Sequence, residues 1–210
     1  MKIRQFGVLV NSAFNYVIKT SQMYNIDESH SLKHSMEVFH LTNKIIDSEI
    51  TKYPYLESQK DIIYSAAILH DMCDKKYINE NEGIKSINNF MCDYMSSHSL
   101  DIMNKIVLSM SYSKVKQNGY PELGNYQMAY HIVREADLLS AYDIDRTIIY
   151  SFMVEKLNYI DSTKRSLNLF ENRILKYRDD KLFVTNYSKN LSLLLHTKAI
   201  KDMKNIQTII

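Results

Sequence analysis

The sequence predicts an all-α protein. Only 4 glycines and 2 prolines occur among its 210 residues, which leaves few places for the tight turns of a sandwich or a barrel. Apolar residues instead recur at intervals of three, four or seven, the spacing of helices that pack on a core. The length suits one large domain with a sizeable core. We therefore expect a single domain over residues 1–210, built from helices joined by short polar loops.

The first three expected helices lead up to the most informative part of the chain. Residues 4–23 and 29–50 carry apolar side chains near helical spacing, which predicts two amphipathic helices. Asp27 or Ser29 is available to cap the second of them. Residues 56–69 end in a near-continuous apolar block, which indicates a buried helix.

The middle of the chain contains the clearest loop. After a polar break at residues 79–83, the pattern predicts two short helices over residues 84–95 and 100–112. Residues 117–124 then gather two glycines and a proline, so we expect a flexible rim over a site. Helical periodicity resumes over residues 128–138.

The last third of the chain predicts three more helices, over residues 140–159, 161–178 and 183–206. The helices of about residues 156–208 form a C-terminal extension. We expect this extension either to complete the core or to provide a homodimer contact.

Composition excludes several classes of protein. The 26 basic and 24 acidic side chains leave a formal charge of +2, which is too balanced to predict nucleic-acid or membrane binding. Cys73 and Cys92 form neither a paired-cysteine metal motif nor a disulfide scaffold, which favours a reducing compartment. The apolar run at residues 6–10 is too short for a signal peptide or a membrane span. We expect a soluble, cytoplasmic protein.

A His-Asp pair ends the buried third helix. His70 and Asp71 offer an imidazole and a carboxylate, which are ligands of divalent cations. His30 and His34 stand four residues apart and would share one face of the second helix, although the metalloprotease glutamate is missing between them. Asp137 lies in an otherwise apolar helical surface, where a carboxylate needs a partner.

The order of these residues resembles a known signature. His34, His70-Asp71 and Asp137 look like the H…HD…D pattern of the HD-domain metal-dependent phosphohydrolases. Several flanking stretches are similar to motifs of that family, the last two to those of its subgroup that hydrolyses small nucleotides: residues 27–38, 66–77, 109–114 and 135–146. The resemblance covers about residues 5–155. Ser31 and Glu37 depart from the subgroup, which has Asp and a basic residue there, and this bears on substrate preference.

The resemblance implies an HD-domain helical bundle with one divalent metal ion. His34, His70, Asp71 and Asp137 would be the ligands, with Mn²⁺ or Mg²⁺ favoured and Fe²⁺, Zn²⁺, Co²⁺ or Ni²⁺ as alternatives. Such an ion lowers the pKa of its water from about 15.7 to about 7 and neutralises charge on a phosphate oxygen. The expected reaction is hydrolysis of a phosphoester or phosphoanhydride bond in a small nucleotide-like substrate.

Four further residues have expected roles next to the catalytic Asp71. Asp74 either caps a helix or orients a metal-bound water. Lys75 and Lys76 are the nearest sources of positive charge for the phosphate in catalysis and substrate binding. His30 is a candidate donor in the cleft.

Arg146 is the last expected substrate-binding residue. It follows Asp137 by nine residues, about 900° of helix rotation, so it can share the site only if the helix bends. Its match to the subgroup's closing motif makes it a phosphate or a structural contact.

Two other functions stay open at this point. One is hydrolysis of a cyclic nucleotide or of guanosine tetraphosphate. The other is a catalytically silent regulatory module that binds metal and nucleotide. All three readings expect a small-molecule nucleotide or phosphate ester as partner.

Overall fold

The computed structural model describes residues 3–208, with side chains from residue 6 onward. Over this range the chain forms ten α-helices and three 3₁₀ helices and no strand, which confirms the predicted all-α class. The elements are α1 (Ile3–Tyr24), α2 (Leu32–Glu49), η1 (Pro54–Gln59), α3 (Lys60–Leu69), α4 (Glu80–Met91), α5 (Ser97–Ser109), α6 (Tyr112–Asn118), η2 (Gly124–Tyr126), α7 (Gln127–Ser140), α8 (Ile144–Met153), α9 (Tyr159–Asn172), η3 (Ile174–Lys176) and α10 (Asn186–Gln207). The predicted domain also included residues 1, 2, 209 and 210, which lie outside the described residues. None of the helices in residues 3–208 is long and apolar enough to cross a bilayer.

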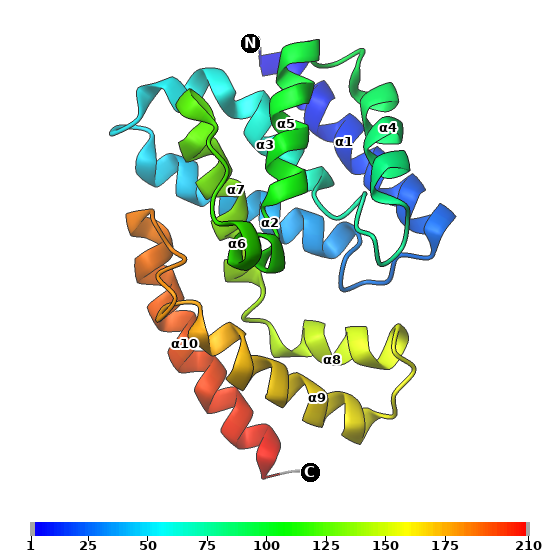
Figure 1. Ribbon diagram of the computed structural model, residues 1–210, viewed down its shortest axis with the longest axis vertical. Helices are drawn as coiled ribbons and strands as arrows, with labels where there is room; N and C mark the ends of the chain where they lie inside the picture. Colours follow the sequence, from blue (N-terminus) through cyan, green and yellow to red (C-terminus); the bar gives the residue numbers. More distant parts are fainter. Residues whose placement is uncertain (1–2, 209–210) are drawn as a thin grey trace.

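Helix α3 lies at the centre of the core. Every residue from Ile62 to Leu69 is buried, as the continuous apolar block predicted. The helix contacts α1, α2, α5 and α7, which surround it in Figure 1. Because α3 ends at Leu69, the pair His70-Asp71 follows directly on a helix that its neighbours hold rigidly.

Several predicted helix boundaries were wrong. Helix α4 begins at Glu80, inside the predicted polar break, and ends at Met91, and the predicted helix 161–178 ends at Asn172. Helix α2 begins at Leu32, because the carboxylate of Asp27 accepts a hydrogen bond from Ser29 N at 2.9 Å and holds the preceding residues in a turn. The third helix opens with the 3₁₀ turn η1, which has Pro54 at its start. The hydroxyl of Ser111 caps a separate helix, α6, where the predicted helix 100–112 ended.

The predicted helix over residues 140–159 is also interrupted. Helix α7 ends at Ser140 and α8 begins at Ile144, with Asp143 as its cap. The Asp143 carboxylate accepts a hydrogen bond from Asp145 N at 3.1 Å. The chain bends between these helices, so the axis of α8 runs in a different direction from that of α7.

The C-terminal helices return to the bundle. Helices α8 and α9 form a hairpin that lies across the ends of α2, α6 and α7 in Figure 1, and α10 packs on α2, α7 and α8. The extension therefore covers one end of the bundle.

Two buried glutamates hold the start of α10. Glu135 accepts hydrogen bonds from Thr185 Oγ1 at 2.6 Å and from Thr185 N at 3.2 Å. Glu49 accepts one from Asn186 N at 3.0 Å. The first turn of a helix has unpaired N–H groups and a positive dipole end, both of which favour a carboxylate. Arg134 donates a hydrogen bond to Leu182 O at 2.5 Å, so a buried polar network joins α10 to α2 and α7.

Gly83 allows α4 to pack against the segment that follows Asp71. A Cβ at this position would lie 2.7 Å from Cys73 Cβ and 2.8 Å from Cys73 Cα. We expect Gly83→Ala to lower the free energy of unfolding by about 1–3 kcal/mol, because the backbone at Cys73 must shift. Urea unfolding measures the change.

Gly7→Ala is the matched control for this prediction. Gly7 is an exposed position of helix α1, and nothing lies within 4 Å of an added Cβ. Alanine there should be neutral or slightly stabilising. Equal stability of the two variants would contradict the packing argument.

Candidate metal centre

Four side chains come together where α2, α7 and the end of α3 meet: the ligand atoms of His34, His70 and Asp137 lie within 4.8 Å of one another, and Asp71 lies against both histidines. His34 comes from the first turn of α2, His70 and Asp71 follow α3, and Asp137 lies in the last turn of α7. The Nε2 atoms of His34 and His70 are 3.0 Å apart. Oδ2 of Asp71 lies 3.3 Å from both Nε2 atoms. Oδ1 of Asp137 lies 3.4 Å from His34 Nε2 and 3.7 Å from His70 Nε2.

The cluster is closed on the histidine side and open on the carboxylate side. The side chains of His34 and His70 are buried, whereas those of Asp71 and Asp137 are 13% and 25% exposed. Both carboxylates line the same cavity. A ligand in that cavity can therefore reach the cluster from one direction.

Hydrogen bonds orient both imidazoles. His70 Nδ1 lies 2.9 Å from Ala67 O, so it donates to this carbonyl and directs Nε2 into the cluster. Arg146 Nη2 lies 3.0 Å from His34 Nε2. Because a guanidinium can only donate, His34 Nε2 is unprotonated and accepts this hydrogen bond, and a metal ion bound there would take over the lone pair from Arg146. Lone pairs on Nε2 are what a metal ion requires of histidine.

The cluster stabilises positive charge. Burial opposes protonation of His70, but the carboxylates of Asp71 and Asp137 outweigh it and raise the pKa of His70 to about 9. Burial would raise the pKa of each carboxyl, yet the histidines lower the pKa of both Asp71 and Asp137. Oδ2 of Asp71 is buried and accepts no hydrogen bond from the described residues. This set of two imidazoles and two carboxylates fits a divalent cation, which competes with protons for such ligands.

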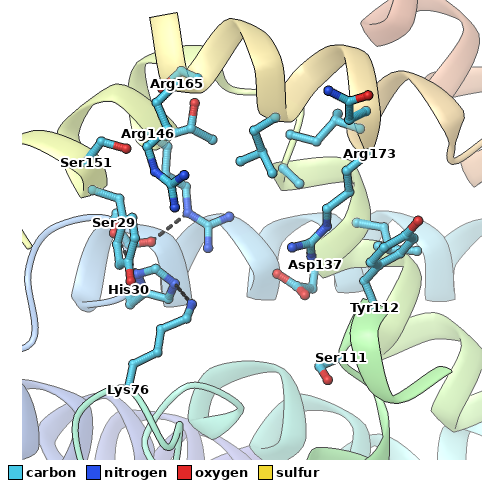
Figure 2. A pocket seen from close by; sticks show the side chains of 18 of the residues that line it. Ser29, His30, Lys76, Ser111, Tyr112, Asp137, Arg146, Ser151, Arg165 and Arg173 are labelled. Atoms are coloured by element: carbon cyan, nitrogen blue, oxygen red, sulfur yellow. Dashed lines mark hydrogen bonds between the residues drawn. The ribbon is translucent and has the colours of Figure 1, made fainter. Parts of the chain in front are cut away.

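A cavity of about 440 Å³ lies in front of the carboxylates, within the range of small-molecule sites. Its walls come from the turns before α2 and after α3, the start of α6, the end of α7 and the hairpin α8–α9. Figure 2 shows Lys76 beside His30 on one side of the cavity and Arg173 on the other, with the guanidinium end of Arg173 next to Asp137.

The structure brings Asp74 and Lys76 to the cavity but not Lys75. Asp74 Oδ1 accepts a hydrogen bond from Lys76 N at 2.9 Å, which forms a turn. This turn leaves Lys75 exposed and outside the cavity wall, so its predicted role at the site was wrong. Asp74 caps this turn and not a helix as predicted, because α4 begins at Glu80 with Asn79 as its cap. The second oxygen of Asp74 lies 3.5 Å from Lys76 Nζ.

His30 lines the cavity from the turn before α2, not from the helix as predicted. Its Nε2 lies 3.1 Å from Lys76 Nζ and its Nδ1 lies 2.6 Å from Ser29 Oγ. Burial lowers the pKa of His30 to about 4, with a further contribution from Lys76, so the ring is neutral and accepts from the ammonium group. His30 also forms a second group with Asp71 and Asp74, whose ligand atoms lie within 4.8 Å of one another.

Arg146 reaches the cluster because the chain bends between α7 and α8. Besides its contact with His34, it donates from Nε to Ser29 O at 2.6 Å and from Nη1 to Ser140 Oγ at 3.2 Å. It therefore ties the turn before α2 to the end of α7 and carries positive charge to the cavity wall.

The loop over residues 117–124 does not form a rim of the cavity, so this prediction was wrong. Tyr120 instead packs against Tyr130, His131 and Arg134. These residues lie three to seven positions before Asp137 on α7 and do not line the cavity.

The sequence did not reveal the contribution of the last third of the chain. Arg165, Arg173 and Tyr177 all line the cavity, as does Tyr112. Charged residues on a helix are usually solvated, and nothing in the spacing of these residues distinguished them from a surface face.

Comparison with known proteins gives a fold but no family. No protein-family model and no curated protein matches the chain. A crystal structure of a Lactobacillus plantarum protein, a structural-genomics target, is similar with a TM-score of 0.73. The match covers 96% of each chain at 17% sequence identity. The similarity supports the all-α fold over nearly the whole chain, including the helices that wall the cavity.

Proposed function

We propose that the protein is an HD-domain metal-dependent phosphohydrolase that cleaves a phosphoester or phosphoanhydride bond of a small nucleotide-like substrate. The observation that carries this proposal is the convergence of His34, His70, Asp71 and Asp137 beside a cavity with cationic walls. Their order along the chain is that of the family signature. These four residues are far apart in the sequence, so chance is a weak explanation for their closeness in space.

His34 and His70 would hold the ion through Nε2, and Asp71 and Asp137 would hold it through carboxylate oxygens. Such a set accepts Mn²⁺ or Mg²⁺ and also Fe²⁺, Zn²⁺, Co²⁺ or Ni²⁺. When bound, a divalent ion supplies a water with a pKa of about 7 and a counter-charge for a phosphate oxygen.

The residues around the cluster supply the fixed charge that phosphoryl transfer needs. Its transition state spreads negative charge over the equatorial phosphate oxygens. Lys76, positioned by Asp74 and His30, and Arg146, positioned by Ser29 and Ser140, put two cations beside the carboxylates. Tyr150 lies under the Lys76 ammonium at 5.1 Å and further fixes its direction.

Phosphate release from a panel of small phosphates tests this proposal. The panel holds nucleoside mono-, di- and triphosphates, cyclic nucleotides and guanosine tetraphosphate. We expect release from at least one linear nucleotide, a loss of at least about 100-fold after EDTA treatment, and recovery with Mn²⁺ or Mg²⁺.

Other outcomes would replace the proposal. Turnover restricted to cyclic nucleotides or guanosine tetraphosphate would support the alternative hydrolase reading. Metal-loaded protein that releases nothing from any substrate would support a silent binding module.

A further inference from the structure

One arginine of the cavity differs from the other cations in having free terminal nitrogens. Arg165 is paired with Glu155. Arg146 uses all three guanidinium nitrogens on protein atoms, and Lys76 contacts His30 and Asp74. In residues 6–208, no carboxylate lies within 4.0 Å of the Arg173 guanidinium, and its only hydrogen bond is made by Nε.

The Arg173 side chain is nevertheless held in place. Its Nε donates to Tyr177 Oη at 3.1 Å, and its guanidinium carbon lies 4.6 Å from the centre of the Tyr112 ring. Burial raises the pKa of Tyr177 to about 12, so this hydroxyl stays neutral. Tyr112 is in turn packed against Tyr177, with ring centres 5.3 Å apart. A guanidinium fixed in this way presents two terminal nitrogens as a planar fork.

The position of this fork indicates what it binds. Figure 2 shows Arg173 pointing into the cavity with its guanidinium end next to Asp137, across the cavity from Lys76, His30 and Arg146. Lys76 and Arg146, the cations expected to contact the reacting phosphate, therefore lie in another part of the cavity from Arg173. The Tyr112 ring is already covered by Arg173 and Tyr177, which leaves the guanidinium edge for a ligand. Oxygens of a phosphate match that edge in shape and charge.

We infer that Arg173, held by Tyr112 and Tyr177, is a second anion subsite, and that the ligand of this cavity carries at least two phosphate groups. One phosphate lies at the metal cluster with Lys76 and Arg146, and the other binds the Arg173 fork. This inference rests on the proposed function for the identity of the first phosphate. It makes a nucleoside diphosphate or a longer relative a better ligand than a monophosphate.

Calorimetric titration of EDTA-treated full-length protein with ADP and with AMP tests the subsite without turnover. The two nucleotides differ by one phosphate. We expect wild type to bind ADP about 10-fold more tightly than AMP or better, Arg173→Gln to lose about 10- to 100-fold in ADP affinity, and its AMP affinity to change less than about threefold. Arg173→Lys should keep part of the ADP preference, because it keeps the charge and loses the fork.

Lys116→Gln is the control for charge. It removes the same unit of charge from another cation that contacts the Tyr112 ring, at 5.6 Å, but Lys116 is exposed and does not line the cavity. This variant should bind both nucleotides like wild type, and thermal unfolding checks that each variant is folded.

Three results would overturn the inference. The first is that wild type binds ADP no more tightly than AMP, and the second is that Arg173→Gln keeps the wild-type preference for ADP. The third is that Arg173→Gln loses equal affinity for ADP and AMP, which would place Arg173 at the first phosphate. Because binding is measured without metal, these results are separate from the phosphate-release panel. If the protein hydrolyses a nucleotide but Arg173→Gln does not change ADP binding, the proposed function stands and the subsite does not. If Arg173→Gln loses the ADP preference but no substrate is hydrolysed, the subsite stands and the proposed function does not.

Discussion

Asp71→Asn should reduce phosphate release by about 1000-fold or more while leaving the protein folded. The change keeps the shape of the side chain and removes its charge. Asp71 Oδ2 lies 3.3 Å from both His34 Nε2 and His70 Nε2, so it is the oxygen that joins the two imidazoles. An amide is a poor ligand for a divalent ion beside two neutral imidazoles. Steady-state kinetics at saturating Mn²⁺ measures the loss.

Asp74→Asn is the matched control for Asp71→Asn. It makes the same chemical change three residues later on the same turn, in a side chain that positions Lys76, whereas Asp71 lies against both His34 and His70. We expect phosphate release to fall by about 10-fold, which is the lower end of the range of about 10- to 100-fold for a residue that orients another. If Asp74→Asn is as damaging as Asp71→Asn, the working site is centred on His30, Asp71 and Asp74 instead. If Asp71→Asn keeps a tenth of the activity, the proposed ligand set is wrong.

Glu135→Ala should lower the free energy of unfolding by about 3–5 kcal/mol. The carboxylate is fully buried and accepts hydrogen bonds from Thr185 N, Thr185 Oγ1 and Val184 N. Removing it leaves these donors and the adjacent Arg134 buried without their partner. For a chain of this size, the melting temperature should fall by about 6–20 °C.

Thermal and urea unfolding followed by circular dichroism measure the effect of Glu135→Ala. Glu171→Ala is the control, because Glu171 is exposed on α9 and its loss should change stability by less than about 0.5 kcal/mol. A fall in melting temperature of less than 2 °C for Glu135→Ala would mean that this network does not hold α10 to the bundle. Such a shift corresponds to at most about 1 kcal/mol.

The sequence was informative where a local pattern determines structure. The apolar block before His70 predicted the central buried helix, because a helix surrounded by neighbours has no polar face. The scarcity of glycine and proline predicted the all-α class. The His34, His70, Asp71 and Asp137 positions could be chosen because their residue types and order resemble the HD-domain signature.

Other features depended on tertiary contacts that no local pattern records. The turn at Asp74 decides that Lys76 faces the cavity and Lys75 faces solvent, yet the two lysines are equivalent in sequence. Arg173 lies far beyond the resemblance and reaches the cavity only because the hairpin α8–α9 folds back. The glycine and proline loop had the composition of a rim, but Tyr120 packs against Tyr130, His131 and Arg134, and the loop does not line the cavity.

If His34, His70, Asp71 and Asp137 hold one divalent ion, the protein binds it stoichiometrically. Metal analysis by plasma mass spectrometry of wild type and Asp71→Asn, after loading with Mn²⁺ and removal of free ion, measures this. We expect one ion per chain in wild type and less than about a tenth of that in Asp71→Asn. Wild type without bound metal, or Asp71→Asn with a full complement, would contradict this ligand set.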